Sequence, residues 1–336
     1  MKILTDIINI PKSHWDALLS TSTMASIFQT ADCYAFYDSL SFLQPFVFAL
    51  VDENDRLRGV VVGYIQCDGG IVKRFFSRRA IINGGPLLAD DISYEELKAL
   101  LDAVRNGISG KAIYIESRNF NDYSKYKGVF EACDFKYEEH LNFHIDTTSE
   151  DVVNANMGKS RKRDVKTSLR DGAVVVENPT LDEVREFYTV LDNLYKTKVK
   201  TPSYPLEFFE KLFQQHFSRF ILVKYDGRII GGTVCVCLEG KAVYEWFACG
   251  ADGVYKNIYP STVATHAGIM YAAQRGYKRF DMMGAGKPSE GYGVRDFKAK
   301  FGGQLVEHGR FRIVLNTPLY GIGKLGIKLM KKDVKL

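Results

Sequence analysis

The sequence of 336 residues has few of the features that bind a metal or form disulfides. Its six cysteines include no CxxC pair; they are Cys33, Cys67, Cys133, Cys235, Cys237 and Cys249. This scatter is typical of buried thiols in a reducing compartment. No Cys/His set has zinc spacing, and His140 and His144 fall in a strand pattern that favours a core pair over a metal site. We therefore expect no metal and no cofactor.

Long apolar runs are also absent. No stretch of about 18 apolar residues lacks charges, and residues 1–11 lack a cationic start followed by an apolar run. We therefore expect a cytoplasmic protein. One segment, 318–336, has apolar residues at helical spacing and five lysines: Lys324, Lys328, Lys331, Lys332 and Lys335. Such a helix could lie on the inner, anionic face of a membrane, or dock on the body with its lysines in solvent.

Sequence-reading nucleic-acid motifs are missing as well. There is no helix-turn-helix, zinc-finger or RNP-type pattern, which argues against a regulator that reads nucleic-acid sequence. Apolar residues make up 46% and charged residues 25% of the chain, as in ordinary globular proteins. A formal charge of +5 permits anionic partners without requiring them.

The length suggests two domains. The first half predicts a hairpin, a strand, a helix, a strand, a helix and a strand, near residues 46–66, 75–82, 93–106, 112–116, 126–132 and 138–145. Ser93 and Glu96 form a capping-box pattern at the first of these helices. The second half repeats the architecture, with helices before a hairpin, a strand, a helix and two strands, near 220–238, 242–248, 259–275, 279–283 and 307–314.

This order is the acetyltransferase-like (GNAT) pattern met twice. It predicts an α/β (α+β) fold of two tandem GNAT-like domains, each a mixed sheet with helices packed on it. The expected domains span residues 1–147 and 148–317, and the basic amphipathic helix follows at 318–336.

With these elements in place, the chain resembles the FemAB family. Its best-known members add amino acids from aminoacyl-tRNA to the peptide of a peptidoglycan precursor. The resemblance spans nearly the whole chain and rests on the order of Phe28-Gln29-Thr30, Gly85-Pro86, the basic segment 159–164 leading to Asp171-Gly172, segment 276–281, and Phe297-Lys298 with Phe301-Gly302-Gly303.

Three departures qualify the resemblance. An acyl-CoA site needs a glycine-rich turn at the start of the long helix, yet residues 255–261 contain no glycine. The second half has no room for the coiled-coil arm of larger Fem ligases. The early helix offers Tyr34, Phe36, Tyr37 and Asp38 where peptidoglycan members tend to supply a lysine and a tryptophan, which puts a UDP-linked acceptor in doubt.

The glycine-rich segment 280–303 is the strongest candidate for an acceptor site, the alternative being a surface loop. Asp281 ends a strand where ligands bind in α/β sheets and could accept a hydrogen bond from an incoming amine. Lys298 or Lys300 could stabilise an oxyanion or bind the ribose and phosphate end of a donor, and the resemblance favours Lys298. As an alternative, either lysine could merely complement a helix dipole.

Further candidates come from a basic helix and two aromatic segments. Lys159, Arg163 and Lys166 would share one helix face that can bind a phosphate, unless the face is simply solvated. Lys198 and Tyr204 lie where UDP-sugar-binding relatives carry a phosphate-binding arginine, which is absent here.

The strand near residue 245 alternates its side chains between the two faces of the predicted sheet. It directs Tyr244 and Trp246 to one face and Glu245 to the other. The aromatic pair could pack against a sugar or peptide, or Glu245 could be the general base. The alternative is an aromatic core with Glu245 paired to a surface lysine.

The leading hypothesis is therefore a Fem-like aminoacyltransferase, an acyltransferase that forms peptide bonds without the ribosome. Its donor would be aminoacyl-tRNA and its acceptor a UDP-MurNAc-peptide or a lipid-linked precursor. Two alternatives remain: an N- or O-acyltransferase of surface polysaccharide or lipid assembly, and a binding module without catalysis.

Overall fold

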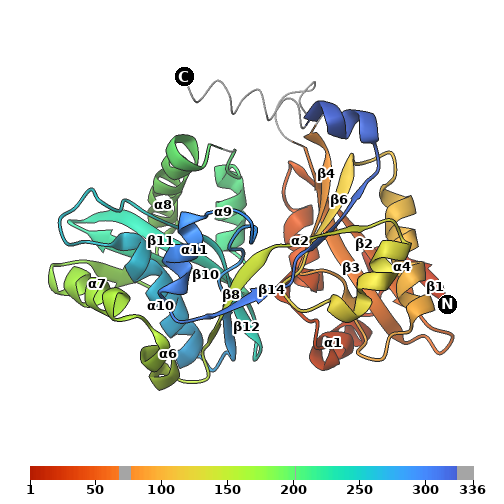
Figure 1. The fold of residues 1–336 in the computed structure, drawn as a ribbon, viewed down its shortest axis with the longest axis horizontal. Coiled ribbons are helices and arrows are strands. Elements are labelled where there is room, and N and C mark those ends of the chain that lie inside the picture. Colours follow the sequence, from red (N-terminus) through yellow and green to blue (C-terminus); the bar gives the residue numbers. More distant parts are fainter. Residues whose placement is uncertain (68–76, 201, 324–336) are drawn as a thin grey trace. The chain divides into compact units, whose positions relative to one another are not determined.

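The computed structural model describes residues 1–67, 77–200 and 202–323, and the chain divides into two compact units. The first unit comprises Met1–Glu139 with His308–Leu336, and the second comprises His140–Glu307. Each unit contains one mixed sheet with helices packed on it (Figure 1). The predicted fold class is thereby confirmed.

The sheet of the first unit has the strand order β1-β2-β3-β4-β6-β15-β7, with β5 paired to β3. Its strands are β1 (Lys2–Leu4), β2 (Leu43–Val51), β3 (Leu57–Gln66), β4 (Arg79–Asn83), β5 (Leu87–Leu88), β6 (Tyr114–Arg118), β7 (Lys136–Glu138) and β15 (Arg310–Val314). Its helices are α1 (Lys12–Thr21), α2 (Ala31–Asp38), α4 (Tyr94–Ile108) and α5 (Lys127–Ala132), with 3-10 turns at Ile7–Asn9, Ile27–Gln29 and Ser124–Tyr126. Helices α4 and α5 bury their apolar sides on one face of the sheet, and α2 packs on the other.

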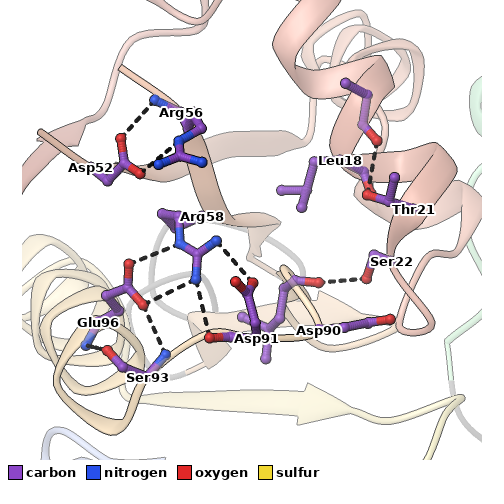
Figure 2. Close-up of polar contacts among 12 residues, drawn as sticks. Leu18, Thr21, Ser22, Asp52, Arg56, Arg58, Asp90, Asp91, Ser93 and Glu96 are labelled. Carbon is purple, nitrogen blue, oxygen red and sulfur yellow. Dashed lines mark hydrogen bonds and ion pairs between the residues drawn. The ribbon is translucent and has the colours of Figure 1, made fainter. Parts of the chain in front are cut away.

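The start of helix α4 has the capping box that the sequence predicted. Ser93 and Glu96 form the predicted capping box, with hydrogen bonds of 2.8 and 3.2 Å. Glu96 also accepts from Arg58 Nε at 2.9 Å, and Arg58 Nη1 donates to Asp91 at 2.9 Å (Figure 2). The start of α4 is therefore fixed to strand β3 by a half-buried arginine.

The second unit has the strand order β14-β8-β13-β12-β11-β10-β9. Its strands are β8 (Leu141–Asp146), β9 (Val174–Val176), β10 (Ser218–Tyr225), β11 (Arg228–Leu238), β12 (Ala242–Gly250), β13 (Arg279–Asp281) and β14 (Gln304–Glu307). Its helices are α6 (Glu150–Asn156), α7 (Lys159–Arg170), α8 (Leu181–Leu194), α9 (Leu206–Phe213), α10 (Pro260–Gln274) and α11 (Gly293–Ala299), and a π-helical turn at Tyr195–Val199 extends α8.

Two adjacent glycines of β11 show how the helices cover this sheet. A Cβ on Gly231 would lie 3.1 Å from Pro260 of α10, whereas one on Gly232 would lie 3.0 Å from Phe187 of α8. Because consecutive strand residues point to opposite faces, α10 and α8 cover opposite faces of the sheet.

The unit boundaries differ from the expected ones in two strands. The stretch expected as one strand at 138–145 is two strands, β7 in the first sheet and β8 in the second. The stretch expected at 307–314 is likewise divided into β14 and β15, which pair in different sheets. Gly309 (φ 60°) allows the second break, where a Cβ would lie 2.3 Å from Tyr137. Alternation of apolar residues does not reveal which sheet a strand joins.

The expected C-terminal helix is described only in part. Residues 317–323 are helical, and Tyr320 contacts Tyr114 at 5.6 Å and accepts a hydrogen bond from Arg312 at 3.1 Å. Residues 324–336, with all five lysines of the segment, lie outside the described residues. None of the described helices is both long and apolar enough to span a bilayer.

Candidate active site

Lys298 of α11 is buried beneath the turn that follows β13. Its side chain is 9% exposed, and Nζ donates to the carbonyl oxygens of Met282, Met283 (3.4 Å) and Gly284 (2.7 Å). An ammonium group has three protons, so these acceptors use its full donor capacity. Burial lowers the pKa of Lys298, against the attraction of Glu245 and Asp281. In this structure Lys298 therefore fixes the glycine-rich turn from within.

The amide groups of the same turn are also occupied. Met283 N donates to Asp281 Oδ1 at 2.9 Å, and Gly284 N donates to Asn142 Oδ1 at 3.0 Å. The turn needs this support because Met283 has φ 49°, a left-handed conformation that costs a non-glycine residue energy. The sequence predicted close backbone approach by an acceptor here, whereas the structure directs these groups into the protein.

Asp281 is fully buried in a polar network on the sheet face opposite α10. Its Oδ1 accepts from Asn142 Nδ2 at 2.7 Å, and its Oδ2 lies 3.1 Å from His144 Nε2 and 3.9 Å from Arg279. Burial opposes ionisation, but His144, Arg279 and Asn142 together outweigh it, and the pKa of Asp281 is lowered. The carboxylate therefore contacts strand β8 and the turn after β13. It has no exposed surface that an incoming amine could reach.

Tyr244 belongs to the same network. It is fully buried, and its hydroxyl lies 3.4 Å from Arg279 Nη2. Burial raises the pKa of Tyr244 to about 12. The structure thus places Tyr244 as an internal partner of Arg279.

Glu245 projects from β12 to the other face, beneath α10. Its side chain is 5% exposed, and Oε1 accepts hydrogen bonds from Thr265 at 2.8 Å and from Thr233 at 3.2 Å. Burial raises the pKa of Glu245, and the opposing effects of Lys298 and the two threonines do not cancel the rise. Glu245 also interacts electrostatically with the buried Lys298, and buried groups with shifted pKa values cluster in active sites.

Strand β12 is bulged at this point and its pairing with β13 stops. The parallel register ends at Tyr244 opposite Asp281, and on the other side Val234 pairs with Phe247 while Cys235 pairs with Glu245. Trp246 is therefore the extra residue of a β-bulge. Bulges are frequent next to active sites because they redirect a side chain and interrupt the ladder.

The bulge directs Trp246 toward α9. Trp246 meets Phe208 edge-on at 5.1 Å, and Tyr204 stacks on the same ring at 4.4 Å. Both Trp246 and Tyr204 are half-buried. Two aromatic side chains from the predicted set are thus brought together through Phe208, with part of each still accessible to a sugar or peptide.

The remaining predicted cations are all exposed. Lys159, Arg163 and Lys166 lie on the outer side of α7, and Lys198 lies in the π-helical turn. Lys300 is exposed, and its carbonyl accepts from Gly158 N at 3.0 Å. Lys298 and Lys300 were expected at one mouth of the sheet, but one is buried and the other faces solvent. Helical periodicity near the end of α11 separates their side chains.

The start of α10 shows what replaces the missing glycine turn. Asp252 Oδ1 accepts from Ser261 N at 3.2 Å, and Ser168 Oγ accepts from Tyr259 N at 2.9 Å. In acyl-CoA enzymes such amides bind the pyrophosphate. Here two of them are already bonded, one of them to a carboxylate that would repel phosphate.

In the described residues of the first unit, the central strands β4 and β6 show no comparable opening. Strands β4 and β6 remain paired as far as Asn83 opposite Arg118. The turn at 84–86 is closed by Gln29 Nε2, which donates to the carbonyls of residues 84 and 85 at 3.1 and 2.9 Å, and by the Tyr123 hydroxyl, 2.7 Å from the carbonyl of residue 86. The polar groups and the strand opening that suit chemistry are therefore combined in the second unit.

Four residues of the site were not found by sequence reasoning. Asn142 and His144 lay in a segment assigned to the first domain, and Thr233 and Thr265 carried no motif. A polar residue at every second position of an otherwise apolar strand was the signal available for Asn142 and His144. Among the residues that the structure describes, no three His, Cys, Asp or Glu side chains are grouped to hold a metal ion.

Comparison with known proteins gives one match to a family model. Residues 156–299, all in the second unit, match the family model of an acetyltransferase (GNAT) domain. The match supports an acyltransferase. No protein with a curated description is similar enough in sequence to match.

Solved structures extend the likeness to both units. FemX superposes with a TM-score of 0.72 at 16% identity, covering 96% of this chain and 99% of that chain. A tandem GNAT protein from the clavulanic acid biosynthesis pathway gives 0.59 at 8% identity, with 94% and 98% covered. The C-terminal domain of a putative lysylphosphatidylglycerol synthetase from Agrobacterium fabrum gives 0.56 at 14%, with 95% and 96% covered. The expected FemAB-like arrangement of two GNAT-like units is confirmed as a fold.

Proposed function

We propose that the chain is a Fem-like aminoacyltransferase. It would move an amino acid from aminoacyl-tRNA to an amine of a peptidoglycan precursor peptide, either UDP-linked or lipid-linked. The acetyltransferase-domain match and the whole-chain likeness to FemX support the general class. The observation that carries the proposal is that Glu245 and Lys298, two buried groups of opposite charge, interact electrostatically where β12 and β13 separate; burial raises the pKa of Glu245 and lowers the pKa of Lys298.

The chemistry assigns a different task to each residue. The acceptor nitrogen attacks the ester carbonyl carbon of the donor, a C–N bond forms, and the C–O bond to the ribose breaks. The proton lost by the nitrogen passes to Glu245, whose carboxyl is held in place by hydrogen bonds from Thr265 and Thr233. Glu245 then returns that proton to the ribose oxygen as it leaves. Lys298 holds the turn that borders the site, and Trp246 and Tyr204 contribute aromatic surface for the acceptor.

The closed start of α10 favours a donor other than acyl-CoA. We expect acetyl-CoA at concentrations up to about 1 mM to give no saturable heat of binding, since typical substrates saturate enzymes between about 1 μM and 1 mM. The reason is the bonding of Ser261 N to Asp252 and of Tyr259 N to Ser168. Isothermal titration calorimetry measures whether acetyl-CoA binds. Saturable micromolar binding that Asp252→Arg changes would show that the pyrophosphate does bind at α10.

A lipid- or polysaccharide-directed acyltransferase is the second candidate. It is favoured by the fold shared with a putative lysylphosphatidylglycerol synthetase, since the name of that protein implies transfer of an amino acid to a lipid. The same residues would carry that chemistry, and only the acceptor would differ.

A transfer assay separates the candidates. Purified protein is mixed with a pool of aminoacyl-tRNAs carrying radiolabelled amino acids and with UDP-MurNAc-pentapeptide, lipid-linked precursor or phosphatidylglycerol vesicles in parallel. We expect label to enter a peptidoglycan precursor, and an exposed-site variant such as Glu239→Gln to behave as wild type. Label in phosphatidylglycerol alone would favour the second candidate, and label in no acceptor would contradict aminoacyl transfer to any of these acceptors.

A further inference from the structure

Helix α7 presents a row of cations to solvent. Six of its twelve residues are Lys or Arg, and its one acidic residue, Asp164, is buried and pairs with Arg161 at 3.5 Å and Arg163 at 3.3 Å. Lys159, Arg163, Lys166 and Arg170 recur at i, i+4, i+7 and i+11 and are all exposed, and Arg170 also pairs with Asp171 at 2.8 Å. At 1.5 Å per residue the row is about 16 Å long, enough for several successive phosphates of one strand.

The charge distribution of α7 is unfavourable for an isolated helix. Its first turn contains Lys159 and Arg161 and no acidic residue, although the positive end of the helix dipole lies there. The exposed ammonium groups of Lys162 and Lys166 add to the same field. A bound polyanion would remove this repulsion, so the charges are explained by a ligand better than by helix stability.

The row is also tied to the elements of the active site. Gly158 N, at the start of α7, donates to Lys300 O at 3.0 Å, and the Arg161 guanidinium lies 4.4 Å from the centre of the Phe297 ring. Arg161 Nη1 donates to Thr262 of α10 at 3.1 Å. An anion held along α7 would therefore have a fixed position relative to α10 and to α11, which carries Lys298.

We propose that the outer face of α7 binds the sugar–phosphate backbone of RNA, which under the proposed function is the RNA of the aminoacyl donor. A nucleotide cofactor would place its pyrophosphate at the start of α10, where Asp252 already bonds the backbone. A membrane surface would require an apolar side on the helix. Of the two aliphatic residues of α7 beyond its cations, Val165 is buried and Leu169 is 44% exposed, so α7 offers charge with little apolar area.

The salt dependence of binding of a deacylated tRNA tests this surface without requiring transfer. Fluorescence anisotropy would be measured from 50 to 200 mM salt for wild type and for the triple variant Lys159→Ala, Arg163→Ala, Lys166→Ala. Each lost phosphate contact lowers the slope of log K against log salt by about 0.7–0.9, so the triple variant should lower it by roughly 2–3. The control, Arg228→Ala, Arg275→Ala, Lys278→Ala, removes the same charge from exposed positions elsewhere in the unit and should leave the slope unchanged.

Three results would overturn the inference: no tRNA binding by wild type, equal slopes for the two triple variants, or loss of binding to anionic phosphatidylglycerol vesicles with tRNA binding intact. The last would mark α7 as a membrane surface. The transfer assay keeps this inference separate from the proposed function. If tRNA binds through α7 but no aminoacyl group is transferred, the proposed function fails alone. If transfer proceeds and the α7 variant has an unchanged KM for aminoacyl-tRNA, the docking surface fails alone.

Discussion

Replacing Lys298 with alanine should abolish transfer and lower the free energy of unfolding by about 2–4 kcal/mol. The carbonyls of Met282, Met283 and Gly284 would lose their common donor, and a buried group left without a partner costs about 1–3 kcal/mol. Removal of a poorly solvated charge offsets part of this cost, since burial lowers the pKa of Lys298. Met283, at φ 49°, would relax and the turn would change shape.

Lys300→Ala is the matched control for this prediction. It removes the same side chain two residues away, where it is exposed, and should change the free energy of unfolding by less than about 0.5 kcal/mol. Urea denaturation and the transfer assay measure both variants. Lys298→Met keeps the aliphatic length without the donor. If it lost activity while keeping full stability, Lys298 would act on the substrate instead of on the turn; if it kept both, the role assigned here would be refuted.

Replacing Glu245 with glutamine should reduce kcat by about 10²–10⁴, the usual contribution of a general base, while the protein remains folded. The glutamine oxygen can still accept from Thr265 and Thr233, which bond the carboxyl at 2.8 and 3.2 Å. It cannot take up a proton. Transfer would be followed under saturating substrates from pH 5 to 9, and Glu239→Gln, an exposed substitution in the same hairpin, is the control. Activity of Glu245→Gln within threefold of wild type would exclude Glu245 as the proton acceptor.

The free energy of unfolding should depend on pH differently in wild type and in Glu245→Gln. Burial raises the pKa of Glu245 in the folded protein above its ordinary 4.5. A raised pKa contributes stability that is complete below the unfolded value and is lost as pH rises through the folded value. Wild type should therefore lose stability relative to Glu245→Gln as pH rises above about 4.5, the unfolded value. Unfolding curves that stay parallel for the two proteins over that range would contradict the raised pKa.

Much of the fold could be predicted because it is encoded locally. The Ser93–Glu96 capping box and the hairpins of β2 with β3 and β10 with β11 are short-range features, and each has the expected pairing. It could not be predicted that β8 pairs in the sheet of the second unit and β15 in the sheet of the first. Both strands have ordinary apolar alternation, and their sheet is chosen by partners more than a hundred residues away, such as β13 for β8.

The sequence indicated which candidate residues lie on neighbouring elements more reliably than it indicated their burial and contacts. Lys298, Asp281 and Glu245 lie on neighbouring elements of one unit, as their motifs indicated. Their burial was not predicted, because exposure depends on what covers a strand end and not on the sequence around it. Tyr244 and Asp281 proved to be internal partners of Arg279 and His144, and the contact between Asp281 and His144 requires β8 to pair in the second sheet.

The sequence by itself determined the tandem GNAT-like order of elements, the absence of a glycine turn at residues 255–261 and the cationic face of α7, since each depends on residue type and spacing along a short segment. Only the tertiary structure decided that Asp252 closes the start of α10, that Lys298 holds a strained turn from within, and that Glu245 lies beneath α10 with two threonines. These roles depend on desolvation and on contacts between distant segments, and both exist only once the chain has folded.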